Sequence, residues 1–261
     1  MQKIPIQPDL SLFPEAFHSL LDGCAVWDSS CSQNAHVYFI EKDGGLFLKS
    51  APNGSLSQEA QMAAFFHSKD LGPEVLSYRS LEQDWLLTRR IPGEDCTHAA
   101  YLDQPEKLCD SISAFLRNLH DQPHSGCPVT NCTAQRLNAA QVSHQLRHWD
   151  ASLLPGIWQF DSPEEAWEIM ESNRHWLKTD TLLHGDYCLP NIMMDNWQFT
   201  GFLDVGGGGI GDRHFDLFWG IWSLSYNLKT CRYTDRFLDG YGRETVEPEI
   251  LRLVAAIEAF A

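Results

Sequence analysis

The first ninety residues contain apolar stretches of strand length, separated by turn residues and one helical segment. Strands are predicted over residues 36–40, 46–49, 74–78 and 85–88. The turn sequence Asp43-Gly44-Gly45 favours a hairpin between the first two of them. A helix is predicted from Ser57, where apolar residues begin to recur with helical spacing. Pro92-Gly93 follows the last strand and marks the expected end of this sheet.

Helical spacing dominates the chain after about residue 100. An amphipathic helix is predicted from five apolar residues with i, i+4, i+7 and i+8 spacing: Leu108, Ile112, Phe115, Leu116 and Leu119. Further helices are predicted over residues 134–149 and 163–176, and an apolar helix begins at Asp216. The link at 150–162 could be a lid that faces a substrate, or a plain connector.

A polar loop, His184-Gly185-Asp186-Tyr187-Cys188-Leu189-Pro190-Asn191, interrupts a run of short apolar stretches. These stretches lie at 182–183, 192–194 and 202–203, and Asp204 directly follows the last one. The pattern predicts a strand, the loop, a strand, a turn and a further strand, which would place the polar groups on a rigid hairpin. Asp186 and Asn191 are separated by four residues, as in the catalytic loop of kinases.

Three of these polar side chains suit the transfer of a phosphoryl group to a hydroxyl. Such a transfer needs a carboxylate to accept or orient the hydroxyl proton, a role that fits Asp186. It also needs Mg²⁺ on the phosphate oxygens, and Asn191 and Asp204 are the candidate metal ligands. The alternative is ordinary turn chemistry, because Gly-Asp and Pro-Asn are common in turns.

The same segment resembles the aminoglycoside phosphotransferase family, a branch of the protein-kinase-like fold. The resemblance rests on H-G-D-Y-C-L-P-N-I-M at 184–193, F-T-G-F-L-D-V-G at 199–206 and G-D-R-H-F-D-L at 211–217. The most similar subgroup modifies a 3' hydroxyl or the related 3'' hydroxyl. The resemblance implies a two-lobed α+β fold, with a small antiparallel sheet lobe carrying one main helix and a larger, mostly helical lobe. The expected division is 1–88 for the first lobe, 89–93 for a hinge and 94–261 for the second.

In such a fold Lys49 would contact the α- and β-phosphates of the nucleotide and pair with Glu59. Lys49 ends an apolar strand, where a charge is unusual, and Glu59 lies in the first turn of the helix that follows. The alternative is that the Lys49 side chain reaches solvent at a strand end and that Glu59 only favours the helix start.

The resemblance implies four further nucleotide contacts. Ser32, in the polar loop 28–34, resembles a residue that reaches a phosphate oxygen, although an ordinary surface turn is the alternative. Phe47 shares the Lys49 face of its strand and could stack on adenine or belong to the core. Arg89 and Ile91 would offer backbone groups to the adenine.

The resemblance also implies a support for the catalytic loop and a cationic substrate. Asp216 would bond the backbone of the loop that begins at His184, or would only favour a helix start. Glu258, Asp161 and Glu164 are the candidate substrate-binding acids. The chain departs from the family in three respects. Only one acid lies near its C-terminus, the loop at 223–234 is less acidic than expected, and Gly207 stands where the family often has a basic residue.

The composition is ordinary for a globular protein, with 43% hydrophobic and 21% charged residues. The net charge of −16 argues against a nucleic-acid partner and suits a cationic small molecule, although solubility alone could explain it. The 8 cysteines include no C-x-x-C pair, which favours free thiols in the cytoplasm. His120 and His124 have helical spacing, but a surface helix is a simpler interpretation than a metal site. Neither a signal peptide nor a membrane span is expected.

The expected function is therefore transfer of the γ-phosphate of ATP or GTP, with Mg²⁺, to a hydroxyl of an aminoglycoside, an activity that confers antibiotic resistance. One alternative is a kinase of the same fold that acts on choline, a sugar or a macrolide. Another is a nucleotide-binding module without turnover. The intact set Lys49, Asp186, Asn191 and Asp204 argues against that module.

Overall fold

The computed structural model describes residues 4–31, 35–150, 152, 158 and 160–260. The chain divides into two compact units. The first unit comprises Met1–Asp95 and Met193–Gly206, and the second comprises Cys96–Ile192 and Gly207–Ala261. Each unit is described by itself.

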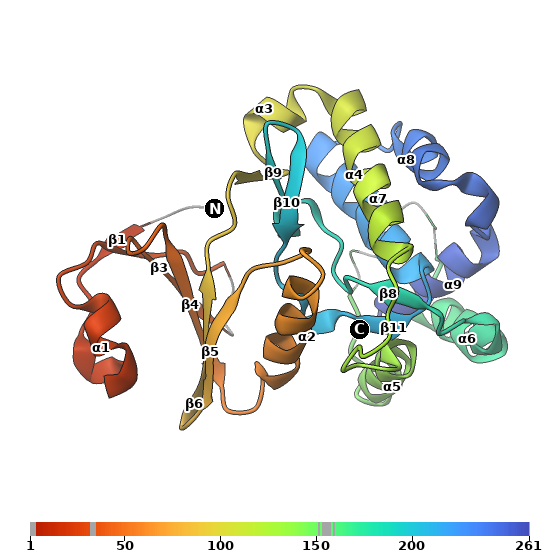
Figure 1. The fold of residues 1–261 in the computed structure, drawn as a ribbon. Helices are drawn as coiled ribbons and strands as arrows, with labels where there is room; N and C mark the ends of the chain where they lie inside the picture. Colours follow the sequence, from red (N-terminus) through yellow and green to blue (C-terminus); the bar gives the residue numbers. More distant parts are fainter. Residues whose placement is uncertain (1–3, 32–34, 151, 153–157, 159, 261) are drawn as a thin grey trace. The chain divides into compact units, whose positions relative to one another are not determined.

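The first unit is built on an antiparallel sheet with the strand order β1-β2-β3-β4-β6-β5 (Figure 1). Its strands are β1 (Ile4–Ile6), β2 (Val26–Asp28), β3 (His36–Ile40), β4 (Leu46–Pro52), β5 (Val75–Ser80) and β6 (Gln83–Arg89). The predicted hairpin is present, since Val37 pairs with Lys49 and Phe39 with Phe47 across β3 and β4. The turn between these strands places Asp43 at φ 50°, a left-handed conformation that Asp tolerates well.

The described residues of this unit form two α-helices. The first, α1 (Glu15–Leu21), buries Phe17 and Leu21 in a core with Leu48 and Trp85 of the sheet. The second, α2 (Ser57–His67), lies beside β5 in Figure 1 and buries Met62 and other apolar residues. Strands of three residues such as β1 and β2 are too short to show a period, so the sequence did not predict them.

A second sheet in this unit has the order β10-β9-β7. Its strands are β7 (Glu94–Asp95), β9 (Ile192–Asp195) and β10 (Gln198–Phe202). Gly93 precedes β7 with φ 94°, and a Cβ there would lie 2.1 Å from the carbonyl oxygen of Met194. Only glycine allows this approach of the two backbones, which explains why the predicted sheet boundary carries Pro92-Gly93.

The second unit is mostly helical. Its helices are α3 (Ala99–Leu102), α4 (Pro105–His120), α5 (Cys132–Gln145), α6 (Pro163–Asn173), α7 (His214–Leu228), α8 (Thr234–Tyr241) and α9 (Pro248–Glu258). The strands β8 (Thr181–Leu183) and β11 (Gly209–Gly211) form a two-stranded antiparallel sheet beside these helices. The predicted amphipathic helix is α4, whose residues Leu108, Ile112 and Leu116 are completely buried.

The predicted α+β class is confirmed: one unit is built on antiparallel sheets with α2 as its main helix, and the other is largely helical. The boundary between the compact units falls at Asp95, and residues 193–206 join the first unit because β9 pairs with β7. The division into 1–88, 89–93 and 94–261 stays a prediction for the functional lobes. The predicted short strands around the loop are present as β8, β9 and β10, and β9 and β10 form a hairpin, while β8 pairs with β11. In the described part of the chain, every helix is too short or too polar to cross a membrane.

Candidate functional site

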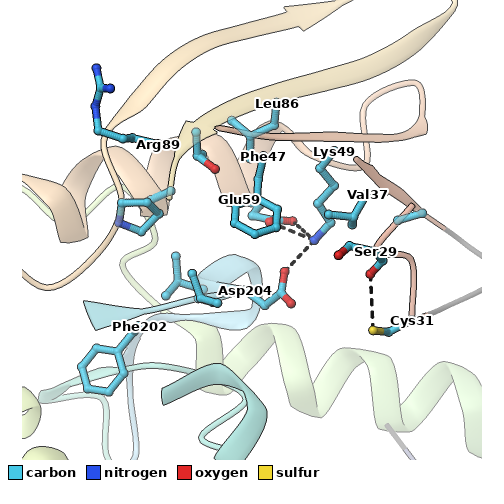
Figure 2. Close-up of a pocket in the computed structure, with 16 residues that line it drawn as sticks. Ser29, Cys31, Val37, Phe47, Lys49, Glu59, Leu86, Arg89, Phe202 and Asp204 are labelled. Atoms are coloured by element: carbon cyan, nitrogen blue, oxygen red, sulfur yellow. Dashed lines mark hydrogen bonds and ion pairs between the residues drawn. The ribbon is translucent and has the colours of Figure 1, made fainter. Parts of the chain in front are cut away.

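Lys49 lies in the middle of β4, and its ammonium group contacts two carboxylates of the first unit (Figure 2). Nζ lies 2.9 Å from Oε1 and 2.8 Å from Oε2 of Glu59, and 2.7 Å from Oδ1 of Asp204. The pair with Glu59 is the one predicted from the sequence. Asp204, the metal-ligand candidate, is 155 residues from Lys49 in sequence but contacts the same ammonium group.

The carboxylates keep this lysine charged. Burial by itself lowers the pKa of Lys49, but the neighbouring carboxylates of Asp204 and Glu59 outweigh burial, so its pKa is raised. For Glu59, burial raises the pKa and Lys49 opposes the rise. The Lys49 ammonium therefore stays protonated at neutral pH and can donate charge-assisted hydrogen bonds to phosphate oxygens.

A cavity of 230 Å³ opens beside this cluster. Lys49, Glu59 and Asp204 form a charged cluster at one part of its wall, and Ser29, Thr88 and Arg89 add further polar groups. The apolar side chains that line it are Ala35, Val37, Phe47, Ala63, Pro73, Leu86, Phe202, Leu203 and Val205. Figure 2 shows the carboxylates of Glu59 and Asp204 on either side of the lysine nitrogen. A ligand with a flat apolar ring and an anionic tail would match this combination.

The four other nucleotide candidates have different positions. Phe47 is half-buried and lines the cavity, and it also packs against Phe39 with ring centroids 5.1 Å apart. Arg89 lines the cavity too, but its backbone N–H already donates to the carbonyl of Glu74. Ile91 is buried and lines a smaller cavity of 80 Å³ that shares Phe47 with the first. Ser32 lies outside the described residues.

Ser29 is a candidate that the sequence did not single out. It is 2% exposed and lines the 230 Å³ cavity, and its hydroxyl has no hydrogen-bond partner among the described residues. A buried hydroxyl without a partner is costly, so a ligand group in the cavity would stabilise it. The signal for it was the run of small polar residues at 28–34, which the sequence could not resolve to one position.

We predict that Lys49→Ala raises KM for the nucleotide by about tenfold to a hundredfold, the factor expected when a bond to a charged group of about 1.5–3 kcal/mol is lost. The melting temperature should change little, because Asp204 is half-exposed and Glu59 can take up a proton. Steady-state kinetics and thermal melting test this. Lys42→Ala removes a lysine from the turn between β3 and β4, which does not line the cavity, and serves as the control. A lower melting temperature with an unchanged nucleotide KM would make Lys49 structural instead.

In the second unit, Asp186 and Asn191 contact each other. Asn191 Nδ2 donates to Oδ2 of Asp186 at 2.8 Å and to its backbone oxygen at 3.0 Å. The loop ends in the 3-10 turn Leu189–Asn191, where the N–H of Leu189 donates to Ser223 Oγ at 2.9 Å. The buried Tyr187 hydroxyl donates to the carbonyl of Ile112 at 2.6 Å. The part of the loop that follows Asp186 is therefore anchored at Tyr187 and Leu189.

Asp216 supports the start of this loop. Its Oδ2 accepts the N–H of His184 at 2.7 Å, and its Oδ1 accepts that of Gly185 at 2.8 Å. His120 lies 3.1 Å from Oδ2, and Tyr241 OH lies 2.7 Å from the other ring nitrogen of His120. His120 is thus buried in this network and not on a surface helix as predicted. Burial raises the pKa of Asp216, but the bonds from His120 and the loop N–H groups outweigh it, so the pKa is lowered and the carboxylate stays charged.

The three substrate candidates differ in exposure. Asp161 is exposed just before the start of α6, and Glu164 is exposed in its first turn. Glu258 is 3% exposed, and its carboxylate pairs with Arg136 of α5. Burial raises the pKa of Glu258 and Arg136 opposes the rise. Substrate contact by Glu258 stays a prediction, although its carboxylate faces a guanidinium and not solvent.

The donor chemistry around the two metal-ligand candidates fits a hard cation such as Mg²⁺, which prefers carboxylate and amide oxygens. The hydrogen bonds found for Asn191 within the described residues use its nitrogen atoms and leave its amide oxygen for a cation. Asp204 is half-exposed, with φ 52°. No cluster of three or more His, Cys, Asp or Glu side chains suited to a metal occurs among the described residues.

Comparisons with known proteins agree with the resemblance. A model of the phosphotransferase enzyme family matches residues 31–253. A "probable aminoglycoside 3'-phosphotransferase" of Lactococcus lactis is 41% identical over 97% of this chain and 96% of its own length. A crystal structure of a type VIII aminoglycoside 3'-phosphotransferase has a TM-score of 0.73 at 23% identity, covering 94% of this chain and 97% of the other. An aminoglycoside phosphotransferase of Streptomyces rimosus in complex with ADP and streptomycin has a TM-score of 0.73 at 21% identity, covering 97% and 98%.

Proposed function

Since the chain belongs to the phosphotransferase enzyme family and to its aminoglycoside phosphotransferase branch, we propose that it transfers the γ-phosphoryl group of ATP to the 3'-hydroxyl of an aminoglycoside. The observation that carries the proposal is the Lys49–Glu59–Asp204 cluster at the end of an apolar cavity. It agrees with the ADP found in the related Streptomyces rimosus enzyme.

The roles of the side chains follow from their chemistry. Lys49 binds phosphate oxygens, and Glu59 holds it in position through the ion pair. The apolar wall with Phe47 receives the adenine ring. Asp186 accepts the proton of the substrate hydroxyl while the hydroxyl oxygen bonds to the γ-phosphorus. The bond between that phosphorus and the bridging oxygen breaks, and ADP leaves.

Two further residues hold the metal in this proposal. Asn191 and Asp204 would hold Mg²⁺ through their side-chain oxygens. When bound, the ion neutralises charge on the phosphate oxygens. Asp216 and His184 keep the catalytic loop in shape, because Asp216 bonds the first two N–H groups of the loop. We place the reaction in the cytoplasm, where ATP is supplied, and leave the use of GTP to the assay below.

The experiment that tests the proposal is an ADP-release assay with two matched substrates. One is an aminoglycoside that carries a 3'-hydroxyl, and the other is its 3'-deoxy counterpart. We expect ADP release with the first and none with the second, with ATP and GTP compared in parallel. Release with choline, a neutral sugar or a macrolide, together with none from either aminoglycoside, would instead identify a small-alcohol kinase.

The charge of the chain gives a second test of substrate class. The net charge of −16 attracts a polycation, and salt screens exposed charges beyond about 10 Å at 0.1 M ionic strength. We predict that KM for the aminoglycoside rises with ionic strength and more steeply than KM for the nucleotide. A salt-independent KM for the best substrate would contradict a polycationic substrate and favour a neutral alcohol.

A further inference from the structure

Both backbone polar groups of Gly185, the residue before Asp186, are held by hydrogen bonds from other elements. Its N–H donates to Oδ1 of Asp216 at 2.8 Å, and its carbonyl oxygen accepts a bond from Nη2 of Arg136. Gly185 has φ 87°, and a Cβ there would lie 2.0 Å from the carbonyl oxygen of Gly207. Both polar groups of Gly185 are bonded, and the backbone of Gly207 lies close to its Cα. These contacts fix the direction in which the chain continues to Asp186.

Arg136 is held in turn by two contacts. Its Nη1 bonds Oε1 of Glu258 on α9, and its guanidinium lies over the ring of Phe215, 4.9 Å from the centroid. The side chains of Arg136 and Glu258 are only 14% and 2% exposed. The planar guanidinium has donors in a rigid fork, so the bond to Glu258 also sets the direction in which Nη2 meets the loop.

Stability gives a weak reason for such a pair. Taking two charges out of water is costly, and apolar replacements of a buried ion pair are often neutral or stabilising. The Nε of Arg136 is also buried, with no hydrogen-bond partner among the described residues. Burying Arg136 is costly, and one of its donors bonds the carbonyl of Gly185, the residue before Asp186. A positioning role explains this arrangement better than a contribution to stability.

We propose that Arg136 and Glu258 are positioning residues for the catalytic loop. Arg136 fixes the carbonyl of Gly185 and thereby the direction in which the Asp186 carboxylate points. Glu258 holds the guanidinium of Arg136 in the orientation that this contact needs. The inference rests on the proposed phosphoryl transfer, in which Asp186 accepts the hydroxyl proton. It assigns Glu258 to holding Arg136 against the loop, in place of the substrate contact expected from the sequence.

The two roles of Glu258 predict opposite kinetic changes. A substrate contact predicts that Glu258→Gln raises KM for the aminoglycoside and leaves kcat unchanged. A positioning residue predicts a lower kcat with unchanged KM for both substrates, because it acts on the peptide that carries Asp186 and not on either ligand. A rise in aminoglycoside KM at constant kcat in this variant would overturn the inference.

The decisive variant is Arg136→Lys. Lysine keeps the charge for Glu258, but its single nitrogen cannot reproduce two donors in a fixed fork. We predict that kcat falls by about 10²-fold, the loss expected for a displacement near 1 Å, with both KM values and the nucleotide Kd unchanged. Arg236→Lys is the matched control, because Arg236 makes a forked pair with Asp110 on the exposed surface of the same unit. The control should keep wild-type kcat.

A double variant separates positioning from stability. Arg136→Met with Glu258→Leu replaces the buried pair by apolar side chains, so the melting temperature should stay near that of the wild type while kcat remains low. Wild-type kcat in this folded variant, or in Arg136→Lys, would overturn the inference. If the double variant does not fold, Arg136→Lys decides, with kcat expressed per folded protein. A wild-type protein without turnover on any aminoglycoside would refute the proposed function instead.

Discussion

Asp186→Asn is expected to fold normally, to bind MgATP as the wild type does, and to lose kcat by about 10²–10⁴-fold, the usual contribution of a positioned acid–base group. Asparagine has the size of aspartate but cannot accept the hydroxyl proton at neutral pH. Its amide oxygen can still accept the bond from Asn191 Nδ2, which now lies 2.8 Å from Oδ2 of Asp186. The loop should therefore keep its shape and lose only its chemistry.

Rapid-quench single-turnover kinetics measure the chemical step, and titration calorimetry measures the MgATP Kd. Asp195→Asn is a suitable control, because Asp195 is an exposed acid after Asn191 in the chain and no role is assigned to it. A near-native single-turnover rate for Asp186→Asn would remove Asp186 from the mechanism. An equal loss of nucleotide affinity would show that the variant disturbs more than the proton acceptor.

Asp204→Ala is expected to weaken Mg²⁺-dependent nucleotide binding by at least about 10²-fold. Loss of even an outer partner of a metal ligand costs about 10–100-fold in metal affinity, and Asp204 is proposed as a direct ligand. Asn191→Ala should weaken the same binding less, because a neutral amide contributes less charge than a carboxylate. Folding should survive in Asp204→Ala, since the side chain is half-exposed and Lys49 keeps Glu59 as its partner.

Titration of Mg²⁺ against bound fluorescent nucleotide measures this effect. The midpoint should move to higher Mg²⁺ in both variants and stay in place in Glu82→Ala, an exposed acid between β5 and β6. The variants also separate the two roles of Asp204. If binding in the absence of Mg²⁺ falls as much as binding in its presence, the residue acts through Lys49 and not through a metal. Unchanged midpoints in both variants would contradict the metal assignment.

The parts of the fold that the sequence predicted are those fixed by local chemistry. The β3–β4 hairpin follows from a glycine-rich turn between apolar stretches, and α4 follows from a clean apolar stripe. The Lys49–Glu59 pair could be predicted because both residues belong to adjacent elements and their types are unusual at those positions. In each case the signal lies within about a dozen residues.

The features that the sequence missed depend on distant partners. Arg136 lies 122 residues from Glu258 and 49 from Gly185, and α5 has no clear apolar stripe that would orient it. The pairing of β9 with β7 joins residues about a hundred positions apart, so periodicity could not place 193–206 in the first unit. Glu258 was assigned by its position near the C-terminus, where nothing in the sequence reveals that α9 buries it.

The measurement that tests the central claim most directly is the chemical identity of the product. The protein is incubated with ATP, Mg²⁺ and an aminoglycoside that carries a 3'-hydroxyl, and the product is studied by mass spectrometry and phosphorus NMR. The account predicts an aminoglycoside heavier by one phosphoryl group, with the phosphorus coupled to the proton at the 3' carbon, formed in step with ADP. ATP hydrolysis that leaves the aminoglycoside unmodified, or a nucleotide that stays bound and intact, would contradict it.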